Sequence, residues 1–248
     1  MLDAMSVPKL RKAVRARPPG LELERELWGA GAEIVVGMDE VGRGAWAGPL
    51  SVGAAVIPKD RRVYKVRDSK LLLPAERAAL FPRLVDWCET WAVGHATAEE
   101  CDLLGMSAAQ RLAARRALDR LALTPDVVVL DGRWDFVGSG RVIPVVRGDA
   151  TSVTIATASI LAKVVRDEIM DDLAPEYPAY GFESNKGYPG PRHRAALAML
   201  GPSAVHRRSW SYMEELPWGG LERRRAQGTL FGPGGGPPPV AGGSTNAR

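Results

Sequence analysis

The chain has 248 residues, 46% of them hydrophobic and 25% charged, which is the composition of a globular protein with room for one sizeable core. No segment approaches the roughly 20 apolar residues of a membrane span, and the basic N-terminus is not followed by the apolar stretch of a signal peptide. We therefore expect neither a membrane protein nor a secreted protein, but a cytoplasmic one.

The formal net charge of +4 is distributed unevenly. Residues 1–30 carry a net charge of +2 and residues 219–248 carry +3, so the stretch between them is nearly neutral. We predict a basic N-terminal arm over 1–30, one folded domain over 31–218, and a disordered tail over 219–248 that is too rich in Gly, Pro and Arg to bury a core. The sequence says little about oligomeric state, and we expect a monomer.

Within 31–218 the apolar patterns predict a succession of strands and helices. Two strands, over 32–39 and 50–58, are expected to form a hairpin around a glycine-rich loop. They are followed, in chain order, by a helix over 74–91, a strand over 91–98, a helix over 107–123, strands over 126–132 and 141–149, and helices over 151–175 and 191–200. This order predicts an α/β fold with a mixed central sheet flanked by helices.

Carboxylates follow three of the predicted strands, namely Asp39 with Glu40, then Asp131, then Asp149. Ligands of open α/β sheets bind beyond the carboxyl ends of the strands, so these acids are expected to lie together if the strands are neighbours. Clustered carboxylates repel one another unless cations neutralise them, and Mg²⁺ prefers oxygen ligands of this kind. Each acid alone is also compatible with a turn or a helix cap, because Asp131 precedes a glycine and Asp149 precedes a helix.

A glycine-flanked arginine follows the first two acids, in Gly42-Arg43-Gly44. Glycines on both sides of Arg43 allow backbone N–H groups to approach a phosphate closely. An acid pair followed by such a loop is harder to explain as a turn than any single acid in the sequence.

Seven segments resemble, in the same order, the motifs of bacterial ribonuclease HII: DEVGRG, RDSK, VVLDG, RGDATSVTIATASILAKVVRD, YPAYGF, NKGYPG and HRRSW. The match runs from about residue 33 to residue 212. The resemblance implies a ribonuclease H-like catalytic domain with a short helical C-terminal extension. It also implies an endonuclease that hydrolyses the RNA strand of RNA–DNA hybrids and nicks duplex DNA 5′ to an embedded ribonucleotide. The implied products are a 3′-hydroxyl and a 5′-phosphate, and the implied role is ribonucleotide excision and primer removal.

The resemblance implies roles for individual residues at the acid cluster and the loop. The catalytic and metal-binding carboxylates would be Asp39, Glu40, Asp131 and Asp149, which would hold two Mg²⁺ or Mn²⁺ ions. The loop that senses the ribonucleotide would consist of Gly42, Arg43 and Gly44, whose backbone can hydrogen-bond the 2′-hydroxyl group.

Four further residues are expected to bind the substrate. Tyr188 matches a tyrosine beside the DNA-side sugar, and Lys70 matches a lysine near phosphates, with Lys163 and Lys186 as additional phosphate partners. Tyr188 is also compatible with an ordinary surface aromatic residue, and Lys163 with a solvated helix lysine. The chain has GYPG where the family usually has GYGT, a difference that affects a local phosphate or backbone contact rather than the tyrosine.

The tail contains a short motif that resembles the bacterial sliding-clamp-binding peptide. Its Q-x-x-L-F pattern consists of Gln227, Leu230 and Phe231. A glutamine can hydrogen-bond at the rim of an apolar pocket that the two hydrophobic side chains fill. The pattern is short, so it is also compatible with a linker that contains incidental apolar residues.

Two other functions remain open from the sequence. Another nuclease with a ribonuclease H fold, such as a resolvase, would also need clustered acids, but it would not explain the glycine loop together with Tyr188. A non-catalytic protein that binds hybrids, or an adaptor tethered to the clamp, would be favoured if one of the four acids were missing, and all four are present.

Overall fold

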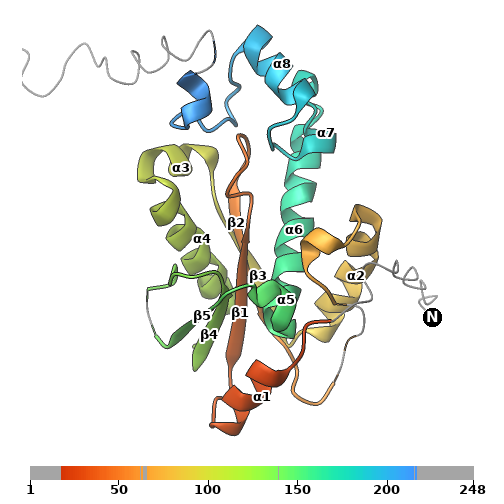
Figure 1. The fold of residues 1–248 in the computed structure, drawn as a ribbon, viewed down its shortest axis with the longest axis vertical. Coiled ribbons are helices and arrows are strands. Elements are labelled where there is room, and N and C mark those ends of the chain that lie inside the picture. Colours follow the sequence, from red (N-terminus) through yellow and green to blue (C-terminus); the bar gives the residue numbers. More distant parts are fainter. Residues whose placement is uncertain (1–17, 62, 64–65, 139, 215, 217–248) are drawn as a thin grey trace, which may run out of the picture.

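The computed structural model describes residues 18–61, 63, 66–138, 140–214 and 216, and its centre is a five-stranded sheet in the order β3-β2-β1-β4-β5 (Figure 1). The strands span Val35–Val41 (β1), Leu50–Val56 (β2), Thr90–Ala96 (β3), Val127–Asp131 (β4) and Val142–Val145 (β5). β1, β2 and β3 are antiparallel neighbours, whereas β4 is parallel to both β1 and β5. The predicted mixed sheet and the hairpin of its first two strands are confirmed.

Helices cover both faces of this sheet (Figure 1). Helix α4 (Met106–Leu121) packs on one face, in a core cluster that also contains Val36 and Met38 of β1. Helix α6 (Val153–Leu173) lies on the other face together with α2 (Pro74–Trp87). Because side chains alternate along a strand, odd-numbered residues of β1 face α6 and even-numbered residues face α4.

Glycines allow both helices to approach the sheet closely. A Cβ atom on Gly53 of β2 would lie 2.4 Å from the carbonyl oxygen of Ala158 in α6. A Cβ atom on Gly94 of β3 would lie 2.1 Å from the carbonyl oxygen of Ala113 in α4. Real Cβ atoms do not tolerate such distances, so the positions of α4 and α6 depend on these glycines.

Part of the segment assigned to the N-terminal arm is folded. Helix α1 (Glu22–Gly29) buries Leu27 against residues of β1, β4 and the start of α6. The Glu24 carboxylate is also buried and accepts hydrogen bonds from the Ser152 hydroxyl group (2.5 Å) and from the N–H of Thr154 (3.0 Å). The folded domain therefore begins before residue 31, and the boundary predicted at residue 30 is too late.

Two other predicted elements differ from the structure. The strand predicted over 141–149 ends at Val145, so Asp149 lies in the short helix α5 (Gly148–Thr151) rather than at a strand end. The helix predicted over 151–175 is divided at Ser152, whose hydroxyl group accepts the N–H of Ile155 at the beginning of α6. The helices predicted over 74–91 and 107–123 are α2 and α4, and the short helix α3 (Ala98–Leu104) precedes α4.

The chain after α6 forms the expected short helical extension, which contains η3 (Pro178–Tyr180), α7 (Phe182–Asn185), α8 (Pro191–Leu200) and η4 (Ser211–Glu214). Its aromatic side chains pack around Met170 of α6 and Ala47 of the β1–β2 loop. No helix in the described part of the chain is long and apolar enough to cross a bilayer. The predicted clamp-binding residues Gln227, Leu230 and Phe231 lie outside the described residues.

Two buried histidines hold the extension together. His193 of α8 and His206 place their Nε2 atoms 2.9 Å apart. The Nδ1 atom of His193 must donate, because it lies 2.9 Å from the carbonyl oxygen of Tyr188, which can only accept. Its Nε2 atom therefore accepts from His206, whose Nδ1 atom accepts the N–H of Ser203 (3.0 Å). Within the extension, a chain of neutral imidazole rings thus connects Ser203 to the backbone of Tyr188.

Candidate active site

A cleft of about 220 Å³ lies near the end of β1, between the β1–β2 loop, η2 (Ser69–Leu71) and α6. Its walls contain nine of the residues that the sequence analysis singled out: Asp39, Glu40, Gly42, Arg43, Gly44, Lys70, Asp131, Lys163 and Tyr188. The other lining residues are Val41, Ser69 and Ser159. Residues from distant parts of the sequence therefore meet in one cleft.

Three carboxylates form a cluster at this edge of the sheet. The register of the parallel strands pairs Met38 with Leu130, so Asp39 and Asp131 follow at the same level and on the same face. Asp149 reaches them from α5, and one carboxylate oxygen from each of the three residues lies within 4.8 Å of the others. Three of the four predicted acids therefore meet, although Asp149 reaches the cluster from a helix, and Glu40 is not in this group.

Burial shifts the protonation of these acids. Desolvation, and then the charge of Glu40, raises the pKa of Asp39 well above its usual value, while a hydrogen bond from Ser159 acts in the opposite direction. Desolvation, and then the charge of Asp149, raises the pKa of Asp131. Both pKa values are raised because negative charges lie close together where water is scarce. A cation placed among the oxygen atoms would lower these pKa values again.

Glu40 lies on the face of β1 opposite to that of Asp39. It is an even-numbered residue of β1, so its carboxylate turns toward α4, where the amide nitrogen of Gln110 donates to it (3.3 Å). The amide oxygen of Gln110 accepts from the guanidinium of Arg43 (3.3 Å), so one buried glutamine connects Glu40 with the loop. Desolvation raises the pKa of Glu40, and the charge of Arg43 partly offsets that shift.

Lys70 is an ionic partner of the acid cluster. Its ammonium group lies 2.9 Å from the carboxylate of Asp149, which is only 6% exposed, whereas the Lys70 side chain is 72% exposed. Burial opposes the charge on Lys70, but the hydrogen bond to Asp149 raises its pKa above the usual value. The contact with Asp149 therefore stabilises the charged form of Lys70 beside the acid cluster.

The loop after β1 contacts Tyr188 directly. The N–H of Gly42 donates to the Tyr188 hydroxyl group (3.1 Å), and Gly42 has a φ angle of +86°, a conformation that favours glycine. Arg43 and Gly44 are exposed at the tip of the loop. The structure therefore brings together the two features that the sequence analysis connected with ribonucleotide recognition.

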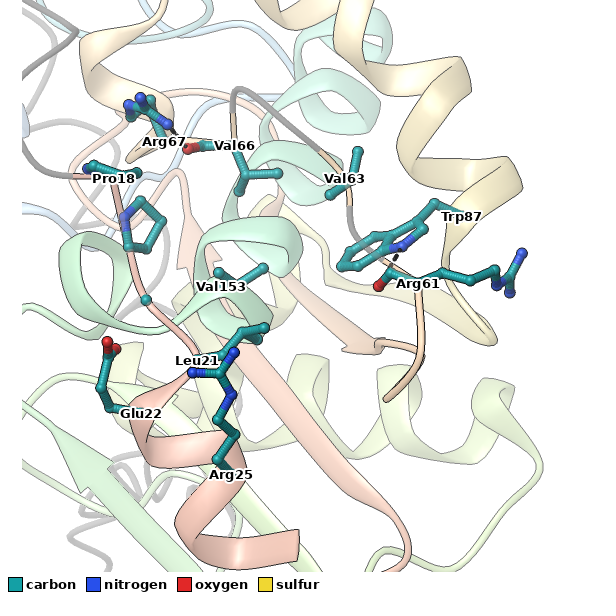
Figure 2. Close-up of a pocket in the computed structure, with 12 residues that line it drawn as sticks. Pro18, Leu21, Glu22, Arg25, Arg61, Val63, Val66, Arg67, Trp87 and Val153 are labelled. Carbon is teal, nitrogen blue, oxygen red and sulfur yellow. Dashed lines mark hydrogen bonds between the residues drawn. The ribbon is translucent and has the colours of Figure 1, made fainter.

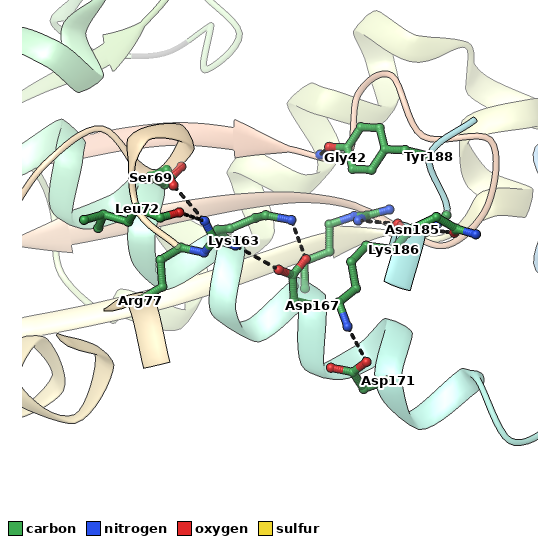
Figure 3. A network of polar contacts seen from close by, with 12 residues as sticks. Gly42, Ser69, Leu72, Arg77, Lys163, Asp167, Asp171, Asn185, Lys186 and Tyr188 are labelled. Atoms are coloured by element: carbon green, nitrogen blue, oxygen red, sulfur yellow. Dashed lines mark hydrogen bonds and ion pairs between the residues drawn. The ribbon is translucent and has the colours of Figure 1, made fainter. Parts of the chain in front are cut away.

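The two other lysines differ in position (Figure 3). Lys163 lines the cleft and pairs with Asp167 (2.5 Å), and burial lowers its pKa. Lys186 is not among the residues that line the cleft, because its ammonium group turns to Asp171 and to the carbonyl of Glu183. The structure therefore brings only the first of these lysines to the cleft.

Several residues of the site were not singled out from the sequence. Gln110 and Ser159 lie on helices whose patterns indicate only packing, and their polar contacts depend on tertiary structure. Arg166 and Arg207 lie inside the KVVRD and HRRSW segments, which were noted only as parts of the family pattern.

A second cavity of about 600 Å³ lies between the segment preceding α1, the loop before η2 and α2 (Figure 2). Its lining is mainly apolar, with Val63, Trp87 and Val153, and three arginines stand around it: Arg25, Arg61 and Arg67. It shares no lining residue with the smaller cleft and contains no cluster of carboxylates. The smaller cleft therefore remains the candidate active site on chemical grounds.

The acid cluster fits a divalent metal ion. Asp39 and Asp149 are buried, and three carboxylates offer oxygen atoms close enough to share one ion. Hard cations such as Mg²⁺ and Mn²⁺ prefer oxygen ligands, and such an ion would offset the repulsion that raises the pKa of Asp39. Within the described residues, this is the group of acids that meets the spacing of a metal site.

Comparison with known proteins identifies a family over most of the chain. Residues 36–213 match the family model described as Ribonuclease HII. Ribonuclease HII of Streptomyces avermitilis is 48% identical over 212 residues, which cover 84% of this chain and 91% of that protein.

Solved structures also resemble the fold. The crystal structure of ribonuclease H2 from Pyrococcus horikoshii OT3 has a TM-score of 0.63 and 30% identity, and the match covers 77% of this chain and 99% of that one. A PCNA:RNase HII complex from Archaeoglobus fulgidus contains a chain with a TM-score of 0.61 and 24% identity, over 72% and 95% of the two chains. The family match over most of the folded domain, together with relatives aligned over nearly their whole length, shows that the chain belongs to the ribonuclease HII family of hydrolytic nucleases.

Proposed function

We propose that the protein is a metal-dependent endoribonuclease that cleaves the RNA strand of RNA–DNA hybrids and nicks duplex DNA 5′ to an embedded ribonucleotide. The observation that carries this proposal is the shared cleft, in which an acid cluster lies beside a glycine loop and a tyrosine. Family membership supports the hybrid as the substrate. The proposed role is ribonucleotide excision and primer removal in the cytoplasm, by a monomer.

The acids would hold the metal ions. Asp39, Asp131 and Asp149 would supply oxygen atoms from the acid cluster, and Glu40, which lies outside that cluster beside Gln110, would supply another. When bound, two Mg²⁺ or Mn²⁺ ions supply activation of the attacking water and neutralisation of the leaving 3′-oxygen. The products would be a 3′-hydroxyl and a 5′-phosphate.

The loop and Tyr188 would choose the position of cleavage. The backbone of Gly42, Arg43 and Gly44 can hydrogen-bond the 2′-hydroxyl group, which is the atom that distinguishes RNA from DNA. Tyr188, held by its contact with Gly42, would lie against the neighbouring deoxyribose. Lys70 and Lys163 line the cleft and would contact phosphates on leaving Asp149 and Asp167, whereas Lys186 lies outside the cleft and is paired with Asp171.

The direct test is cleavage of a labelled DNA duplex that contains one ribonucleotide, with Mg²⁺, with Mn²⁺ and with EDTA. We expect a metal-dependent nick 5′ to the ribonucleotide, cleavage of a long hybrid, and no cleavage of an all-DNA duplex. Cleavage of the hybrid without the nick would contradict the proposed recognition of single ribonucleotides. If neither substrate is cleaved, the protein is a binding protein rather than a nuclease.

The variant Asp39→Asn tests the metal assignment. It removes a charged ligand without removing a contact to the substrate, so cleavage should be abolished while binding of the hybrid is largely retained. Asp126→Asn is the matched control, because the Asp126 carboxylate accepts the N–H groups of Glu33 and Ile34 (2.8 Å each), away from the cleft. Retained cleavage by Asp39→Asn would refute the assignment.

We also propose that Gln227, Leu230 and Phe231 bind the sliding clamp. The relative from Archaeoglobus fulgidus was solved in a complex with PCNA, which favours a clamp partner for this chain. Arginines 223–225, next to the motif, would add attraction to DNA. In a pull-down with the clamp, the full chain should be retained and a chain with all three residues changed to alanine should not. Equal retention of both would reject the idea.

A further inference from the structure

Two fully buried arginines lie behind the β1–β2 loop (42–49). Arg166 is in the middle of α6 and Arg207 is in the extension, and neither side chain has any exposed surface. Among the residues that the structure describes, neither guanidinium forms an ion pair with a carboxylate. A buried charge is unfavourable unless its hydrogen-bonding groups are satisfied, so the partners of these two residues are informative.

Arg166 donates only to backbone carbonyl groups. Its Nε atom donates to Pro49 (2.8 Å), one terminal nitrogen to Ala47 (3.1 Å), and the other to Lys186 (3.0 Å). The same guanidinium lies 5.4 Å from the centre of the Tyr188 ring. One planar group therefore joins the end of the loop to the segment that holds the tyrosine.

Arg207 contacts the same loop from the extension. Its Nε and one terminal nitrogen both donate to the carbonyl of Gly48 (3.2 and 3.1 Å), and the other terminal nitrogen donates to the carbonyl of Arg43 (3.0 Å). Its backbone N–H donates to the carbonyl of Trp46 (2.8 Å). Together the two guanidinium groups bind the carbonyls of residues 43, 47, 48 and 49.

The loop also rests directly on Arg166. A Cβ atom on Gly42 would lie 2.1 Å from the Nε atom of Arg166, so only glycine fits there. Gly48 has a φ angle of +78°, and a Cβ atom there would lie 2.2 Å from the sulfur of Met170. The base of the loop is therefore tightly held, whereas Arg43 and Gly44 at its tip are exposed.

We propose that Arg166 and Arg207 are positioning residues that clamp the carbonyl groups of the 42–49 loop, so that its exposed tip keeps the conformation that recognises the ribonucleotide. The inference rests on the proposed function, because it gives that loop its task. The planar fork of the guanidinium is the essential feature, since a lysine ammonium keeps the charge but cannot bind several fixed carbonyls in one plane.

The variants Arg166→Lys and Arg207→Lys test this proposal. We expect each to lower kcat/KM for nicking at a single ribonucleotide by roughly 10- to 100-fold, because small misplacements of binding groups have effects of that size. Amide hydrogen exchange should become faster in residues 42–49 and stay unchanged in β1, β4 and α4. Mn²⁺ affinity, measured by calorimetry without nucleic acid, should also stay unchanged.

Arg116→Lys is the matched control, because the Arg116 guanidinium also donates to a backbone carbonyl, that of His95 (2.7 Å), but does not touch the loop. It should nick at the normal rate. Normal nicking and normal loop exchange in both test variants would overturn the proposal. So would faster exchange throughout the sheet or a parallel loss of Mn²⁺ affinity, since those results mean a general structural role. If the unmodified protein does not nick, the proposed function fails, while the exchange data still decide whether the two arginines hold the loop.

Discussion

Asp39 and Glu40 are neighbours in the sequence, yet their carboxylates contact different groups. The pleat of β1 turns Asp39 toward the acid cluster and Glu40 toward Gln110 on the opposite face. Only one orientation of the Gln110 amide satisfies both of its neighbours, because the guanidinium of Arg43 can only donate and the Glu40 carboxylate can only accept. Gln110 thus fixes the position of one acid relative to the loop.

The variant Gln110→Met tests this role. Methionine has a similar length but forms neither hydrogen bond, so Glu40 loses its buried donor. A hydrogen bond to a charged group contributes about 1.5–3 kcal/mol, which corresponds to a roughly 10- to 100-fold lower kcat/KM for nicking. Gln110→Glu should be worse, because it places a second negative charge beside Glu40. Nicking at the normal rate by the methionine variant would show that Gln110 only fills space.

At the scale of elements, the sheet and its two covering helices depend on glycine. Gly53 and Gly94 allow the backbones of α6 and α4 to lie against β2 and β3. Both lie inside strands, where glycine is otherwise unfavourable. Their presence is explained by close packing rather than by an unusual backbone conformation.

The variant Gly53→Ala should destabilise the protein. The added methyl group would lie 2.4 Å from the carbonyl oxygen of Ala158, so α6 would have to move. Overpacking of this kind lowers the free energy of unfolding by about 1–3 kcal/mol or more, which urea denaturation measures. Gly29→Ala is the control, because a methyl group on that last residue of α1 would have no atom within 4 Å, and it should change stability by no more than about 1 kcal/mol. Equal stabilities of the two variants would contradict this account.

The elements that the sequence predicted least well are those fixed by distant residues. The strands are short apolar runs, and the sequence predicts four of the five within a few residues. The break at Ser152 depends on Glu24, which lies far away in the chain and accepts the Ser152 hydroxyl group. Local patterns do not contain information of this kind. Helix α1 is different, because Leu23 and Leu27 have the i,i+4 spacing of an amphipathic helix, and the arm predicted over 1–30 overlooks that pattern.

At the scale of the whole molecule, the histidine pair holds the extension together next to Tyr188 of the candidate site. Burial lowers the pKa of His206 to about 3 and also lowers the pKa of His193. Arg208 and Arg194 lower these values further. Both rings therefore stay neutral in the folded protein at a pH where they are protonated in the unfolded chain.

This difference predicts acid sensitivity. The folded pKa values lie below the unfolded value of about 6.5, so stability is unaffected at higher pH and falls as the pH decreases below that value. His206 alone should contribute a loss of about 2 kcal/mol between pH 7 and pH 5. Urea denaturation at both pH values should show that the free energy of unfolding falls less for His206→Gln than for the unmodified protein. The acidic residues titrate alike in both proteins, so the difference between them reports His206. Equal losses would contradict the prediction.

The sequence accounts for many of the residues that line the candidate site, but not for the residues that hold them in position. The acids and the loop residues stand next to strands or in a glycine-rich turn, which is why they could be singled out one by one. Lys186 shows that a motif does not predict where a side chain points, because a lysine beside a motif can turn to a nearby acid such as Asp171. Gln110, Arg166 and Arg207 could not be found in this way, since their partners are carbonyl and amide groups brought close only by folding.

The parallel pairing of β1 with β4 also sets an order of events during synthesis of the chain. Asp39 and Glu40 leave the ribosome early, with their hairpin partner directly behind them, and N-terminal segments fold first. Asp131 and Asp149 follow only after the whole of β2, β3 and α4, and Arg207 follows after the long helix α6. A nascent chain therefore has no complete acid cluster until Asp149 has been made, and no clamped loop until Arg207 has been made near the end of the folded domain. Premature termination anywhere before the extension would release a fragment without an assembled site.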